Sequence, residues 1–124
     1  MRSAFWDDHE RDLRDPEYAR EFAAESARIS ALDALVNALE QARAAEGLTK
    51  ADLARATGIT GSAVRRLLTA ANPNPTLGTV VEIAAALGLK LTVEPMTEEE
   101  RRAVTEPMLC GVRKAASGTE KDVA

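Results

Sequence analysis

The chain contains one cysteine, one histidine and few aromatic residues, and these shortages exclude several kinds of chemistry. Cys110 has no second cysteine for an internal disulfide, and Cys110 with His9 cannot supply the four ligands of a structural zinc site. Nucleophilic catalysis by a Ser–His–Asp or Cys–His arrangement would have to use His9, which lies in an acidic N-terminal segment. We therefore expect no enzyme, no metal and no cofactor.

Long apolar runs are also missing from this sequence. None approaches the ~20 residues that a membrane-spanning helix requires. Residues 1–8, MRSAFWDD, lack the apolar stretch of a secretory signal. We expect a cytoplasmic protein without a membrane partner.

The composition favours helices. Aromatic residues make up 3% of the chain, and alanine and leucine dominate its apolar residues. A length of 124 residues gives room for one small domain with additional arms. A helical core of about 60 residues is only marginally stable alone, which favours oligomerisation or a partner.

Charge is unevenly distributed over a chain whose net charge is −4. Residues 49–93 carry five basic and two acidic side chains, a net of +3. Residues 1–48 have a net charge of −5, and residues 94–124 a net charge of −2. A basic middle fits a polyanion such as DNA, and an acidic arm fits a basic partner. The alternative for the charged arms is that they are ordinary solvated helix faces.

Local signals divide the chain into three parts, residues 1–28, 29–94 and 95–124. We expect residues 1–14 to form a flexible arm, because they are charged and lack periodicity. Asp15 and Pro16 are typical of a helix start, and we expect this helix to run from about 16 to 28. Ser30 then predicts the start of a second helix, which Gly47 ends.

Three short helices are predicted in the basic middle. Thr49 and Asp52 have the spacing of a capping box, and Gly58 ends the helix that they begin. Thr60 begins the next helix, whose inward residues are Val64, Leu67 and Leu68. After the loop Asn72–Pro73–Asn74–Pro75, the last of the three helices begins at Thr76 and ends at Gly88.

Residues 89–93 alternate apolar and polar side chains, which predicts a short strand that ends before Pro95. A single strand has no partner for its backbone hydrogen bonds, so we expect it to pair with the same strand of a second protomer. The dimerisation residues would be Leu89, Leu91 and Val93. Thr97 predicts a polar helix to about 105, with another turn or two after Pro107 and a disordered tail from Ser117.

The basic middle resembles the helix-turn-helix of the phage repressor and Cro (XRE) family. The resemblance rests on Ala54, Gly58, Ile59, Val64 and Leu67, followed by residues 74–89, which resemble the closing helix of that family. It implies an all-α fold: a five-helix-type, lambda repressor-like domain with one short C-terminal strand, paired across a dimer. It also implies binding of duplex operator DNA as a homodimer.

In such motifs the second helix lies in the major groove and its N-terminal part faces the bases. We expect Lys50 and Asn72 to contact the sugar–phosphate backbone of the DNA. Gly61 departs from the polar residue usual at its position, so one base contact is missing. The alternative for Arg65 and Arg66 is a solvated helix face. The predicted DNA-binding residues are Lys50, Thr60, Gly61, Ser62, Arg65, Arg66, Thr69 and Asn72.

The flanks resemble HigA-type antitoxins, through the segment Asp15–Pro16–Glu17–Tyr18 and through residues 87–93. This resemblance implies repression of a toxin–antitoxin operon in the bacterial cytoplasm, where the protein is associated with the nucleoid when bound to DNA. It also implies capture of a RelE- or HigB-like toxin that cleaves mRNA. The residues expected to contact the toxin are Phe5, Trp6, Tyr18 and Phe22.

Two alternatives remain open. Tyr18 and Phe22 could instead pack against the helix that begins at Ser30. The whole chain could also be a stand-alone XRE-family transcriptional regulator that has no toxin partner.

Overall fold

The computed structural model describes residues 4–69 and 74–117. The chain divides into two compact units, one formed by residues 29–94 and the other by residues 1–28 together with residues 95–124. The described residues contain helices and irregular segments, but no strand. The mostly helical prediction is therefore confirmed. Asn72 and residues 118–124 of the tail predicted from Ser117 lie outside the described residues, whereas Ser117 itself is the last residue of a helix.

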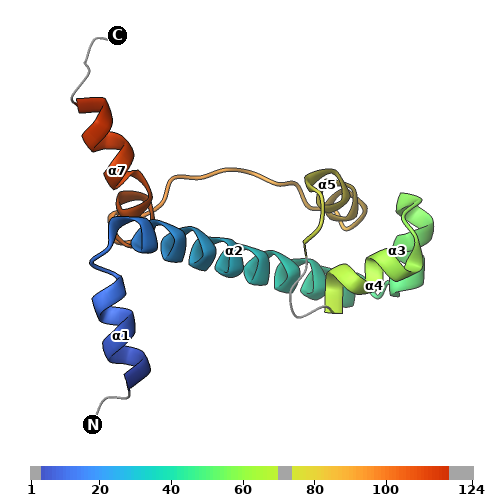
Figure 1. The fold of residues 1–124 in the computed structure, drawn as a ribbon. Helices are drawn as coiled ribbons and strands as arrows, with labels where there is room; N and C mark the ends of the chain where they lie inside the picture. Colours follow the sequence, from blue (N-terminus) through green and yellow to red (C-terminus); the bar gives the residue numbers. More distant parts are fainter. Residues whose placement is uncertain (1–3, 70–73, 118–124) are drawn as a thin grey trace. The chain divides into compact units, whose positions relative to one another are not determined.

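The unit of residues 29–94 is built around three short helices: α3 (Lys50–Thr57), α4 (Gly61–Thr69) and α5 (Leu77–Ala86) (Figure 1). Helix α3 contacts both α4 and α5. The core includes Leu39 from α2 (Pro16–Glu46) and the buried side chains Leu53, Val64, Leu67, Leu68, Ile83, Ala84 and Leu87. Removing these apolar groups from water provides the main stabilising free energy of the unit.

The boundaries of the three helices follow the predicted signals. Thr49 and Asp52 form a reciprocal capping box at the start of α3. Gly58 ends that helix with a left-handed backbone, at φ 74°. Thr60 Oγ1 accepts the N–H of Ala63 at 3.1 Å, and Thr76 Oγ1 accepts the N–H of Thr79 at the same distance. Each hydroxyl satisfies a backbone donor that the first turn of a helix leaves unpaired.

Helix α2 is one continuous helix of 31 residues (Figure 1), so the predicted break before Ser30 is wrong. Its start is as predicted, because Pro16 is its first residue and Asp15 Oδ1 accepts the N–H of Glu17 at 3.0 Å. No glycine or proline lies between Pro16 and Gly47, and serine is only mildly unfavourable inside a helix. The alanine- and leucine-rich sequence therefore carries the helix through Ser30.

The expected flexible arm over residues 1–14 is also wrong, because residues Ala4–Asp12 form helix α1. Phe5, Trp6 and His9 lie on this helix, and the ring of His9 contacts the rings of Tyr18 and Phe22 on α2. These ring contacts give α1 a packed face. The sequence prediction overlooked them because it relied on aliphatic periodicity alone.

The predicted strand over residues 89–93 does not form within the chain. The segment is irregular, and residues 90–93 make no backbone hydrogen bond in the part of the chain that the structure describes. A strand is defined by a ladder of bonds to a neighbour, and no second strand is present among those residues. The described residues therefore do not confirm the predicted strand, whose expected partner was the same segment of a second protomer.

The C-terminal helical segment passes through Pro107 instead of breaking before it. Helix α6 (Glu98–Glu100) leads into the π-helix η1 (Arg101–Thr105) and then into α7 (Glu106–Ser117). The N–H of Glu106 donates to the C=O of Arg101, five residues back. This wider turn accommodates a proline, which has no N–H to donate and would clash with the carbonyl of a normal helical turn.

Candidate nucleic-acid interface

The turn between α3 and α4 is held by bonds that the local sequence supplies. Thr57 Oγ1 donates to the C=O of Leu53 at 2.7 Å and accepts the N–H of Ile59 at 3.2 Å. Gly58 provides the left-handed residue that a tight connection between crossing helices requires. The second helix is thereby set against the first in a fixed orientation.

Helix α4 has one buried and one exposed face. Val64, Leu67 and Leu68 are buried in the core of residues 29–94. The opposite face is exposed and contains, with Thr60 just before the helix, the residues Gly61, Ser62, Arg65, Arg66 and Thr69. The six predicted DNA-contacting residues of this segment therefore share one solvent-facing surface.

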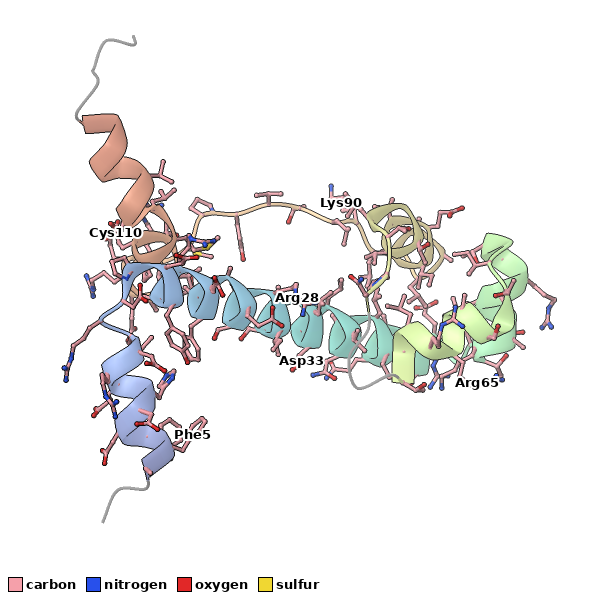
Figure 2. The ribbon with its side chains drawn as sticks, in the orientation of Figure 1. Phe5, Arg28, Asp33, Arg65, Lys90 and Cys110 are labelled. Atoms are coloured by element: carbon pink, nitrogen blue, oxygen red, sulfur yellow. The ribbon has the colours of Figure 1, made fainter. Side chains whose placement is uncertain are left out.

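Arg65 and Arg66 differ from the other arginines of this unit in their partners. Arg55 pairs with Asp52, and Arg43 pairs with Glu40. Neither Arg65 nor Arg66 has a side-chain hydrogen bond or ion pair among the residues that the structure describes, and Figure 2 labels Arg65 on α4. An unpaired guanidinium retains its donors for an external acceptor, such as a base edge or a phosphate.

Lys50 lies at the first helical position of α3 and is half-buried. Its charge helps to lower the pKa of the Glu40 carboxyl, although the hydrogen bond from Arg43 is the largest cause of that shift. Lys50 therefore has an acidic neighbour in the free protein. A DNA phosphate would compete with this carboxylate for the ammonium group.

Arg43, near the end of α2, stabilises the entry to the helix-turn-helix through contacts that were not predicted from the sequence. Its side chain donates from Nη1 to the C=O of Leu48 at 2.5 Å and from Nε to Glu40 Oε2 at 3.0 Å. Arg43 thus ties the last turn of α2 to the loop that leads into α3. In the sequence, the i, i+3 spacing of Glu40 and Arg43 on a helix could have predicted their ion pair. The second oxygen of Glu40 is buried without a hydrogen-bond partner in the described structure.

The four residues predicted to contact a protein partner lie together in the other unit. Phe5 is 68% exposed, Trp6 54% and Phe22 44%, whereas Tyr18 is half-buried. Packing of Tyr18 and Phe22 against a separate helix from Ser30 is ruled out, because residues 30–46 continue the helix that carries both rings.

The predicted dimerisation residues Leu89, Leu91 and Val93 are exposed, and Val93 is fully so. Cys110, to which the sequence assigned no role, is also exposed. The described residues contain no group of histidine, cysteine and carboxylate side chains that could hold a metal. None of their helices is long and apolar enough to cross a membrane.

Comparison with protein families assigns the motif. A helix-turn-helix domain family matches residues 34–95, which include α3, α4 and α5. The chain belongs to this helix-turn-helix family. Comparisons with curated proteins and with solved structures gave no match.

The helix-turn-helix domain confirms the coarser part of the sequence prediction, a DNA-binding domain of the phage repressor-like class. Helix α4 is the second helix of this helix-turn-helix, and Arg65 and Arg66 lie on its exposed face.

Proposed function

We propose that the protein is a dimeric transcriptional repressor and the antitoxin of a HigBA-like toxin–antitoxin module. The observation that supports DNA recognition most directly is the exposed face of α4 on a helix-turn-helix domain, which carries two arginines that have no side-chain partner among the described residues. In this proposal the face enters the major groove. Arg65 and Arg66 offer bidentate donors to guanine, and Ser62 can donate or accept.

The reading face has few side chains. Gly61 has no side chain at a position close to the start of the recognition helix. Specificity would therefore depend more on the spacing of two half-sites and on DNA shape than in a domain with a full set of base contacts.

Binding to the DNA upstream of its own gene tests this part of the proposal. A gel-shift titration at one fixed salt concentration should show tighter binding to that DNA than to a scrambled duplex of the same composition. The double variant Arg65→Ala/Arg66→Ala should lose this preference while its far-ultraviolet circular dichroism is unchanged. Equal affinity for both duplexes would contradict an operator-specific repressor.

Dimerisation through residues 89–93 is the second part of the proposal. The segment alternates exposed apolar side chains with polar ones, and the backbone of residues 90–93 has no hydrogen-bond partner in the described chain. The same segment of a second copy would satisfy both the backbone groups and the apolar face, in a two-stranded ribbon across a two-fold axis.

The ribbon is tested by placing a charge on its apolar face in one variant and on its polar face in another, and comparing their oligomeric states. Leu91→Lys should convert the dimer to a monomer in light scattering, because it places a charge in the apolar face. Thr92→Lys, its neighbour on the opposite face, should remain dimeric. A dimeric Leu91→Lys protein would argue against this interface.

Capture of a RelE-like toxin is the third part. It is supported by the HigA-like flanks and by the exposed aromatic residues of an acidic segment, since toxins that bind RNA are basic. Co-expression should allow the protein to restore growth to cells that make the product of the adjacent reading frame. No protection and no co-purification would favour the alternative, a stand-alone regulator. The helix-turn-helix match supports a transcriptional regulator and does not distinguish the two.

A further inference from the structure

A cluster of five rings joins α1 to the first turns of α2, within the unit that contains residues 1–28. It consists of Phe5, Trp6, His9, Tyr18 and Phe22. Three of its large side chains are about half or more exposed, and Figure 2 shows Phe5 extending from α1. Exposed aromatic groups gathered in one place are typical of an interaction surface rather than of a core.

His9 lies at the centre of this ring cluster. Its Nδ1 lies 3.1 Å from the hydroxyl oxygen of Tyr18, and its ring centroid lies 4.6 Å from that of Phe22. The ring also stacks on Phe5 at 6.2 Å with an interplanar angle of 2°, and it meets Trp6 edge-on at 6.0 Å. The central ring thus contacts each of the other four rings, of which Phe5, Trp6 and Phe22 keep part of their surface in water. A preorganised aromatic surface loses little side-chain entropy when a partner binds.

The charge around the ring cluster is negative. Residues 1–28 contain eight acidic side chains and five arginines. Arg11 pairs with Asp8, Arg28 with Glu25 and, at 3.8 Å, Arg20 with Glu21, so three of the positive charges are neutralised within the segment. The carboxylates of Asp12 and Glu17 form no ion pair in the part of the chain that the structure describes. The surface therefore repels polyanions and favours a cationic ligand.

We propose that the ring cluster is a docking surface for an arginine-bearing segment of a partner protein. A guanidinium is planar and weakly hydrated, and it stacks on the faces of tryptophan, tyrosine and phenylalanine more readily than a lysine ammonium does. The surrounding carboxylates supply the counter-charge. This inference deepens the proposed function and rests on its premise that the chain binds a protein as well as DNA.

Charge argues against the other occupants of the ring cluster. A second copy of the chain would bring two acidic surfaces together, and a nucleic acid or an anionic membrane would meet the same repulsion. A purely apolar partner would leave the carboxylates of the segment without a role in recognition.

Trp6 is the only tryptophan of the chain, so its fluorescence reports directly on the ring cluster. The full chain is titrated with a twelve-residue peptide of alternating arginine and alanine, and with matched lysine and glutamate peptides. The arginine peptide should change the Trp6 emission in a saturable manner. The lysine peptide should bind at least tenfold more weakly, the glutamate peptide should have no effect, and 1 M salt should suppress the change.

Variants locate the binding. Phe22→Ala should weaken binding of the arginine peptide about tenfold or more. Phe5→Ala should have the same effect, and because the Phe5 side chain is more exposed, its removal carries less risk to folding. Val112→Ala is the matched control, because Val112 is an exposed apolar residue on α7 in the same unit. It should bind the peptide as the parent protein does.

Several results would overturn the inference: no emission change with millimolar arginine peptide, equal effects of Phe5→Ala and Val112→Ala, or equal binding of the lysine peptide. So would a saturable response to phosphatidylglycerol vesicles, or self-association that Phe5→Ala abolishes. Measuring operator binding by the same variants distinguishes failure of this inference from failure of the proposed function. Loss of peptide binding with operator binding intact would contradict only the docking surface. Peptide binding without operator binding would contradict only the repressor.

Discussion

Arg66 lies on the exposed face of the recognition helix and has no internal partner in the described structure. We expect Arg66→Ala to weaken operator binding by about 1–3 kcal/mol and to relax the preference at one base pair. Arg66→Lys should recover the non-specific part of the affinity but not the base preference, because lysine lacks the bidentate fork. Gel-shift titrations against single-base operator variants measure both quantities. Undiminished affinity of Arg66→Ala would remove this residue from the interface.

Gly58 and Gly61 make a matched pair in the same motif. A Cβ at either position would meet no heavy atom within 4 Å, so backbone conformation alone decides the effect of alanine. Gly58 has φ 74°, and Gly58→Ala should lower the free energy of unfolding by about 1–2 kcal/mol. Gly61→Ala lies in a helix, and it should leave the stability unchanged or raise it by up to ~1 kcal/mol. Urea denaturation distinguishes the two. Equal effects would contradict the backbone explanation.

At the scale of the element, the start of α3 depends on pH. The hydrogen bond from the backbone N–H of Thr49 is the largest cause that lowers the pKa of the Asp52 carboxyl, and Arg55 adds to it. The pKa of Asp52 is thus lower in the folded state than in the unfolded state. The carboxylate therefore stabilises the fold above its unfolded pKa, and this stabilisation is lost as the pH falls through the folded value.

The prediction concerns Asp52→Asn. This variant retains an oxygen that can accept from Thr49 but cannot titrate, so its melting temperature should fall less than that of the parent between about pH 5 and pH 2. Thermal melts followed by circular dichroism across this range provide the measurement. Asp33→Asn, which changes an exposed carboxylate on α2, is the control and should follow the parent. A parent-like acid response of Asp52→Asn would show that the capping box does not contribute to it.

At the scale of the whole molecule, a chain with a net charge of −4 can contain a DNA-binding domain because acidic side chains are scarce in residues 49–93, where five basic side chains outnumber two acidic ones. Affinity for a polyanion depends on the charges at the interface and on the counterions they displace. Lys50→Gln removes one of these charges. We expect it to reduce the slope of log affinity against log salt by about 1, because one DNA phosphate would no longer be neutralised.

Glu17→Gln is the control for this prediction, since Glu17 lies on the acidic segment outside the helix-turn-helix domain. It should change the salt slope little. An unchanged slope in Lys50→Gln would mean that Lys50 remains with Glu40 when DNA binds, instead of contacting a phosphate.

The ends of α3, α4 and α5 could be predicted because short-range interactions set them. Thr49, Thr60 and Thr76 each satisfy a donor three residues ahead, and Gly58 is the residue that can adopt a left-handed turn at low cost. The buried face of α4 followed from helical periodicity for the same reason. The exposed candidate face was then its complement, and so its residues could also be named from the sequence.

Other features depended on contacts between distant residues. Helix α2 continues through Ser30, because serine can cap the start of a helix but is also tolerated inside one. Helix α1 forms where the ring of His9 contacts the rings of Tyr18 and Phe22. The sequence by itself determined the capped helices and the charge of the motif, because those arise within a few residues. Only the tertiary structure decided which helices merge, which arginines remain unpaired and which rings share one surface, because these depend on what packs across space.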